Sequence, residues 1–259
     1  MSARILHIAS NTFREAVRDR VLYNLIAFAV LMSGAAILVG QISINIERLV
    51  VINLGLTAIS LFGIVIAIFI GIGLVSKEID KRTLYTVLSR PVRRWEFIAG
   101  KFCGLGGTLV VNTICMAVGI FAALLYIWPH HLQASDTSIL VALYFIILQF
   151  LIITALALLF SSFSSPLLSA IFAFALFVIG TFSEDLRGFA QMTHGAERWL
   201  ATAAAYMVPN ISALNVIAQV AHEQQIPGQL IVLNTAYALV YSFMALLGAV
   251  LIFERRNLK

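Results

Sequence analysis

The side chains that could bind a metal ion are few, and they do not form a ligand set. Imidazole and thioether groups are ligands for transition metals, but a site needs several of them at suitable spacings. The candidates lie between the apolar runs of the chain: His130, His131, His194 and His222, with Met192 and Met207 nearby in sequence. Because their spacings match no defined site, we expect ordinary polar histidines and no metal centre.

Motifs for catalysis and nucleotide binding are also missing. The pair Gly100-Lys101 could end a phosphate-binding loop, but Trp95 stands where the leading glycine of GxxxxGK[ST] is required. The sequence contains no HExxH and no GxSxG, and its long apolar runs lack the charged residues that proton-coupled transporters place at depth. We therefore expect neither enzyme activity nor a cofactor in this chain, so any energy comes from another subunit.

The composition indicates the elements that hold these residues. Apolar residues make up 61% of the 259 residues and charged residues 11%, whereas soluble domains have about 45–50% and 25%. The sequence predicts an all-α integral membrane protein with one transmembrane domain, residues 1–259. Its six expected spans are Val21–Val39, Val50–Val75, Phe102–Ile127, Ile139–Phe160, Pro166–Phe182 and Leu230–Phe253.

Two further segments are amphipathic or interrupted. Residues 1–20 place apolar side chains on one helical face and charged ones on the other, which predicts an elbow helix at the membrane interface. Residues 183–228 contain two apolar stretches, 199–208 and 211–220, each too short to cross a bilayer. We interpret these stretches as outer or re-entrant helices between the fifth and sixth spans.

The basic residues favour one orientation. With six spans, all but three of the 17 Lys and Arg residues fall on the side that holds both termini and the 76–101 connection. Arg48, Arg187 and Arg198 are the three on the other side. By the positive-inside rule, we expect a multi-pass protein of the inner (plasma) membrane with cytoplasmic N- and C-termini. A seventh crossing would move the C-terminal basic residues outside and weaken this bias.

The connection 76–101 between the second and third spans is the most polar internal segment. Leu84, Tyr85 and Leu88 fall on one face of a short helix, and Pro91 ends that helix because it lacks an amide donor. From pattern alone, a solvated loop helix and a docking helix explain the segment equally well.

The order of residue types in this connection resembles the first cytoplasmic loop of ATP-binding-cassette (ABC) exporter permeases of the second type. The branch it most resembles includes permeases for the maturation of copper enzymes such as nitrous-oxide reductase. One departure is Arg82, where many relatives carry glycine. The resemblance is carried by Glu78, Asp80, Lys81, Arg82, Thr83, Leu84, Tyr85, Leu88, Ser89, Arg90, Pro91, Val92, Arg93, Arg94, Phe97, Gly100 and Lys101.

The resemblance implies a coupling helix that docks on a separate ATPase subunit, present in two copies that bind ATP and Mg. It also implies a second permease copy, identical or related, surrounding lipid, and in some relatives an accessory protein outside the membrane; no nucleic acid is expected. Glu78 would cap the loop or form a salt bridge within it. The docking residues would be Arg82, Thr83, Leu84, Tyr85, Leu88, Arg90 and Pro91.

Polar residues within the spans allow two interpretations. They could line a translocation path between subunits, or they could form hydrogen bonds between neighbouring helices, which we favour. The residues concerned are Asn112, Thr113, Gln149 and Asn234.

Together, the resemblance and the uncharged spans predict the membrane subunit of an ATP-driven exporter. The alternative within the same architecture is a mechanotransmitting complex, which relays ATPase work to a periplasmic partner without moving a solute. An ion-gradient-driven transporter is disfavoured because the spans carry no charge.

Overall fold

The computed structural model of the chain describes residues 2–18, 20–42, 47–80, 93–127, 137–192, 198–199, 202 and 208–255. Within these ranges the regular structure is helical throughout, without a strand. The helices are α1 (Ser2–Arg18), α2 (Arg20–Ile42), α3 (Glu47–Asp80), α5 (Arg94–Ile127), α6 (Thr137–Ser161), α7 (Pro166–Thr181), α8 (Ser183–Met192), η2 (Ser212–Leu214), α10 (Ile217–Ala221) and α11 (Gly228–Arg255).

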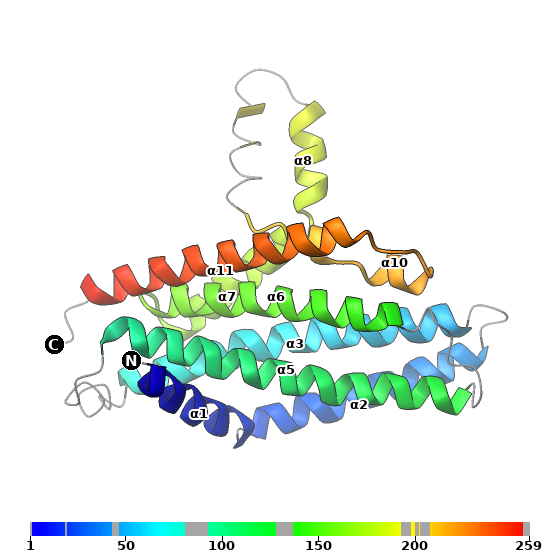
Figure 1. Cartoon of the computed structure of the whole chain (residues 1–259), viewed down its shortest axis with the longest axis horizontal. Coiled ribbons are helices and arrows are strands. Elements are labelled where there is room, and N and C mark those ends of the chain that lie inside the picture. Colours follow the sequence, from blue (N-terminus) through cyan, green and yellow to red (C-terminus); the bar gives the residue numbers. More distant parts are fainter. Residues whose placement is uncertain are drawn as a thin grey trace.

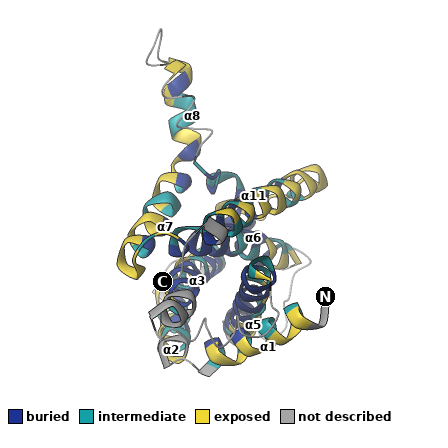
Figure 2. Ribbon diagram, turned by 90° about the vertical axis from the view of Figure 1, so that its left-hand side faces the viewer, coloured by how far each residue is buried: buried dark blue, intermediate teal, exposed yellow. Residues whose placement is uncertain are grey.

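Helix α6 forms the centre of the bundle. Its sequence is apolar on all sides, which is typical of a helix surrounded by other helices. It packs against α3, α5, α7 and α11, while α2 packs against α3 and α5. Figure 2 shows the buried residues concentrated in α3, α5 and α6, and exposed residues along α1, α7, α8 and α11. The exposed side chains of α7 and α11 are mostly apolar, as expected for surfaces in contact with lipid or another subunit.

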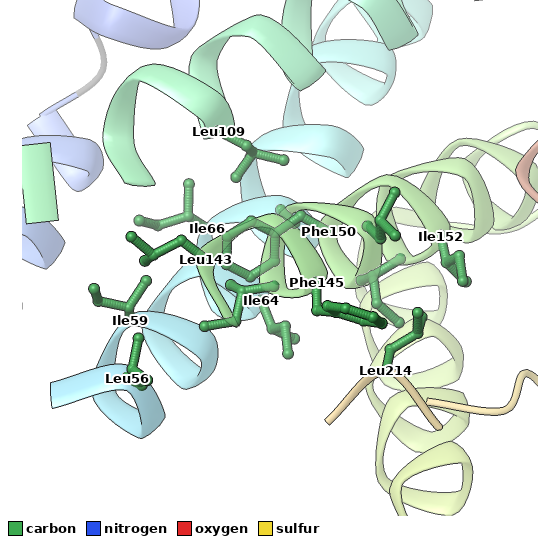
Figure 3. Packing of buried hydrophobic residues seen from close by; sticks show 14 of the residues in the cluster. Leu56, Ile59, Ile64, Ile66, Leu109, Leu143, Phe145, Phe150, Ile152 and Leu214 are labelled. Carbon is green, nitrogen blue, oxygen red and sulfur yellow. The ribbon is translucent and has the colours of Figure 1, made fainter. Parts of the chain in front are cut away.

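Large aliphatic and aromatic side chains fill the space between these helices (Figure 3). Ile59 and Ile64 of α3 and Leu109 of α5 belong to the same cluster as Phe145 of α6. Leu214 of η2 joins this cluster and is fully buried. The segment that contains η2 is therefore packed into the core.

Four of the described helices are long and apolar enough to cross a membrane. They are Arg48–Gly73 of α3, Arg94–Leu125 of α5, Thr137–Ser161 of α6 and Gly228–Phe253 of α11. Helices α7 and α8 would make a fifth span only as one broken span, because they meet at a bend of 59°; the apolar part of α2, Leu25–Gln41, is shorter. The chain is thus a multi-pass α-helical membrane protein, and the expected six spans remain a prediction.

The boundaries near the 76–101 connection differ in extent from the expected spans. Helix α3 continues to Asp80, and α5 already begins at Arg94, so helical structure extends into this segment from both sides. Between α6 and α7, the predicted start of the fifth span at Pro166 is confirmed, because α7 begins with this residue. Proline suits this first helical position, where its missing amide donor leaves no hydrogen bond unmade.

The segment 183–228 is built differently from the two apolar helices that we expected. It starts with α8, an amphipathic helix that we did not predict, which projects away from the bundle in Figure 1. The stretch 211–220 contains two short pieces, η2 and α10, and is not one continuous helix. Most of the stretch 199–208 lies outside the described residues.

One end of the bundle brings together three chain segments that are distant in sequence. Figure 1 places the start of α1, the start of α5 and the end of α11 at this end, and the contacts of α5 with α1 and with α11 agree. Helix α5 follows the 81–92 segment in the chain. A displacement of that segment would therefore reach α1 and α11 through their contacts with α5.

Candidate functional site

The first three turns of α5 form the candidate site, which we call the α5 junction. Residues of α1 and of α11, which are distant in sequence, both contact α5 here. The α5 junction consists of Arg94, Glu96, Phe97, Gly100, Lys101 and Gly104 of α5, Arg4, Ile8 and Ala9 of α1, and Phe253 of α11.

A buried carboxylate caps the start of α5. The Oε2 atom of Glu96 accepts a hydrogen bond of 2.9 Å from the backbone N–H of Arg93. This is the carboxylate half of a capping box, in which the third helical residue satisfies the amide of the residue before the helix. Glu96 is 2% exposed, and the guanidinium of Arg4 lies 4.0 Å from the same oxygen. Glu96 therefore fixes the entry into α5 and pairs it with the start of α1.

Two glycines form the surface of α5 on which α1 lies. A Cβ at Gly100 would come within 2.6 Å of Ile8 Cγ2, and a Cβ at Gly104 within 2.6 Å of the carbonyl oxygen of Ala9. Side chains at these positions would push the two helices apart. The Gly-x-x-x-Gly spacing, which in membrane helices permits close approach, thus serves a contact within this chain.

The other side of the α5 junction holds the end of α11. Nη1 of Arg94 donates a hydrogen bond to the carbonyl oxygen of Phe253, one of the last carbonyls of α11, which lack partners within the helix. The same guanidinium lies 5.7 Å from the centre of the Phe253 ring, and that ring stacks on Phe97 at 6.0 Å. A cation at a helix C-terminus is also favoured by the helix dipole. Arg94 consequently links α5 to α11.

Lys101 is the most deeply buried cation of the α5 junction. It is 1% exposed, and its Nζ lies 5.6 Å from the centre of the Phe97 ring. An ammonium over an aromatic face is attracted by the electron density of the ring. Phe97 is thus in contact with both Lys101 and Phe253, and it joins the two sides of the α5 junction.

We expect Glu96→Ala to destabilise the chain by about 1–2 kcal/mol, because it removes the cap and leaves the amide of Arg93 without its acceptor. Glu96→Gln should cost less than half as much, since its amide oxygen can still accept the capping bond. The half-exposed Arg4 adds little to the difference, because solvent screens its charge. Thermal unfolding of the two purified variants would measure this, and equal losses would show that the cap is not the stabilising feature.

The predicted docking residues of the coupling helix cannot be placed. Arg82, Thr83, Leu84, Tyr85, Leu88, Arg90 and Pro91 all lie outside the described residues. Glu78 belongs to the last turn of α3, and only its backbone is described. The roles of these residues stay predictions. The α5 junction is the nearest described structure on their C-terminal side.

The predicted polar residues of the spans lie on three different helices. Asn112 and Thr113 are buried on α5, where Thr113 Oγ1 donates to Leu109 O of its own helix at 2.8 Å. Gln149 of α6 accepts a hydrogen bond of 3.1 Å from Ser60 Oγ of α3. Asn234 of α11 donates from Nδ2 to the carbonyl oxygen of Ala213 at 2.8 Å. Gln149 and Asn234 thus form hydrogen bonds between separate elements, and both interpretations of the polar residues stay predictions.

A polar network centred on Asn210, between α7, α8 and α11, was not predicted from the sequence. Its Oδ1 atom accepts hydrogen bonds from Ser183 Oγ at 2.7 Å, Ser212 Oγ at 3.0 Å and Ala213 N–H at 3.2 Å. Its backbone N–H donates to the hydroxyl of Tyr237 at 2.8 Å. Asn210 therefore fixes the bend at Ser183 to α11. In the sequence, the pair Pro209-Asn210 indicates a turn at this point, since Asn commonly stabilises turns through its side chain.

Metal-binding groups do not gather in the described part of the chain. Within that part, no three His, Cys, Asp or Glu side chains are close enough to hold an ion. His222 is exposed next to Glu223, whose carboxylate lies 3.4 Å from Arg48. His130, His131 and His194 lie outside the described residues.

The chain matches a known family over nearly its whole length. The family model described as "ABC-2 family transporter protein" matches residues 6–258. A search of curated proteins found no match.

Proposed function

Since the chain belongs to the ABC-2 family of transporter proteins, we propose that it is the membrane subunit of an ATP-driven exporter and that it is coupled to its ATPase through the 76–101 connection. Permeases of this family normally work with a separate ABC ATPase subunit. The ATPase would bind ATP and Mg, and this chain would convert its movement into a change of the spans. We place the chain nearest to the copper-enzyme-maturation branch, on the residue order of the connection alone.

The observation that carries the coupling proposal is the set of contacts around the start of α5. Residues 81–92 lead directly into a helix whose first turns hold α1 through Glu96 and Gly104 and hold α11 through Arg94. A force applied to the connection would therefore act on three helices together. Rigid, packed elements of this kind transmit displacement better than a loop that ends in solvent.

The proposed assembly has two copies of this permease and two ATPases. Leu84, Tyr85 and Leu88 would insert their apolar face into a groove of the ATPase, with Arg82 and Arg90 beside acidic groups at its rim. Six spans, the two termini in the cytoplasm and an inner-membrane location complete the proposal, and the distribution of basic residues supports them.

The direct test is a double variant of the connection, Leu84→Asp with Leu88→Asp. Two carboxylates in an apolar docking face should reduce the ATPase that is recovered with the tagged chain at least tenfold, because each substitution removes an apolar contact and introduces a buried charge. The measurement is nucleotide hydrolysis in the material purified from native membranes.

The control is Met192→Asp, which introduces one carboxylate at an exposed position of α8 and should leave the recovered ATPase unchanged. Undiminished hydrolysis with the double variant would contradict docking through Leu84 and Leu88. If the unaltered chain brought no ATPase with it, the proposed function itself would fail.

A further inference from the structure

A cavity of about 590 Å³ lies beside α8 and is separate from the α5 junction. We call it the α8 cavity. Its walls are one face of α8, the segment 210–219 and the first part of α11. A volume of this size is within the range of pockets that hold small molecules, about 300–1,000 Å³.

Helix α8 contributes polar side chains to the lining of the α8 cavity. Glu184, Arg187 and Gln191 are spaced as one helical face, and all three line the cavity. The opposite face carries Phe189 and Met192, which are 59% and 79% exposed and do not belong to the lining. An ordinary surface helix buries its apolar face, whereas α8 leaves Phe189 and Met192 exposed and presents Glu184, Arg187 and Gln191 to the cavity. The cavity thus has a mixed lining with several polar side chains, whereas the hydrophobic core of the bundle is lined by apolar side chains.

Carboxamides dominate the polar lining, and several are held in fixed positions. The Oδ1 atom of Asn210 accepts three hydrogen bonds. The Oδ1 atom of Asn215 accepts one from the backbone N–H of Ile217, and Nδ2 of Asn234 donates one to the carbonyl oxygen of Ala213. Each of these amides keeps its second polar atom for a ligand, because a carboxamide has both donors and an acceptor. Gln191 and Gln219 line the cavity as well. Fixed amides lose little conformational entropy when a ligand binds.

The chemistry of this lining selects among ligand classes. In the described part of the lining, one Glu and one Arg balance in charge, so this part offers no net attraction to a phosphate, a nucleotide or a metal cation. Aromatic side chains are absent from the described lining, which disfavours planar apolar molecules. Groups that donate and accept at neighbouring positions match ligands with many hydroxyls, since each hydroxyl also donates and accepts.

We propose that the α8 cavity binds a neutral, hydroxyl-rich ligand of the carbohydrate class, either as a free saccharide or as the sugar headgroup of a lipid. If the ligand is the exported cargo, this inference rests on the proposed export function. Binding of the ligand to the cavity requires no ATPase. The side chains that contact the sugar would be Gln191, Gln219 and Asn234, with Asn210 holding the cavity in shape.

The experiment uses the full chain in phospholipid nanodiscs, without a sugar detergent and without ATPase. Maltose is titrated calorimetrically as the free saccharide, and diglucosyl-diacylglycerol in the nanodisc is detected by native mass spectrometry as the headgroup. Gly188 lines the cavity, and a Cβ there meets no described atom within 4 Å, so Gly188→Trp can place a bulky ring in the cavity and Gly188→Ala is its matched control. Gln219→Leu removes one amide, and Gln225→Leu does so at an exposed position outside the lining.

We expect at least one sugar probe to bind, with affinity about tenfold weaker in Gln219→Leu and lost in Gly188→Trp. Gly188→Ala and Gln225→Leu should bind as the unaltered chain does. Maltose binding would identify a free saccharide, and binding of the glycolipid alone would identify a headgroup. The proposal is overturned if neither probe binds, or if Gly188→Trp binds as well as Gly188→Ala. Loss of ATPase recovery would bear on the proposed function and would leave these binding results intact.

Discussion

Gly104→Ala is expected to lower the free energy of unfolding of the chain by about 2–3 kcal/mol, the range of an overpacked helix contact. The added Cβ would lie 2.6 Å from the carbonyl oxygen of Ala9 and 2.7 Å from Thr12 Cβ. A backbone oxygen cannot rotate away as a side-chain end can, so α1 itself must move off α5. This movement also separates Arg4 from Glu96 and weakens the α5 junction.

The matched control for this prediction is Gly119→Ala on the same helix. A Cβ at Gly119 meets no described atom within 4 Å, and alanine has the higher helix propensity by roughly 1 kcal/mol. Heating the purified proteins and following helicity by circular dichroism should therefore show a lower midpoint for Gly104→Ala and an unchanged or higher one for Gly119→Ala. If both variants unfolded at the same temperature as the parent, α1 would not be seated on Gly104.

The sequence could predict which segments are helical and apolar, because hydropathy depends on composition over some twenty residues. The expected spans Ile139–Phe160 and Leu230–Phe253 correspond closely to α6 and α11. The start at Pro166 was also predictable, since proline has a strong positional preference at helix starts. These features depend on local rules and need no knowledge of the neighbouring helices.

The candidate site could not be predicted in the same way, because its residues acquire their roles through packing. The spacing of Gly100 and Gly104 can be read from the sequence, but spacing does not say which helix approaches them. Arg94 was attributed to the connection, whereas its side chain reaches the carbonyl of Phe253 at the other end of the chain. Both contacts join segments that are distant in sequence, and a single sequence carries no signal for such pairs.

Helix α8 was missed for a different reason. Its sequence alternates Leu186 and Phe189 with Glu184, Arg187 and Gln191 at helical spacing, and this pattern was available. Length is the main criterion for membrane segments, and α8 has only ten residues. A short amphipathic helix does not stand out by that criterion.

The contact between α3 and α6 is expected to be the most sensitive to an added methyl group. A Cβ at Gly63 would overlap with Cζ of Phe150, far inside ordinary van der Waals contact, and Phe150 is only 1% exposed (Figure 3). The ring has no free space to enter, so Gly63→Ala should cost about 3 kcal/mol or more, at the upper end for overpacked cores. Thermal unfolding of the purified chain would measure the loss.

A second substitution decides whether this loss comes from Phe150 itself. Phe150→Leu removes the far end of the ring, so the double variant Gly63→Ala with Phe150→Leu should be more stable than Gly63→Ala alone, with a coupling of about 2 kcal/mol. Gly73→Ala on the same helix, where a Cβ meets no described atom within 4 Å, should be nearly neutral. Additive losses in the double variant would contradict the direct contact, and α3 would then have to approach α6 through other residues. A rescue would instead establish that the spacing of these two central helices is set by a glycine facing one aromatic ring.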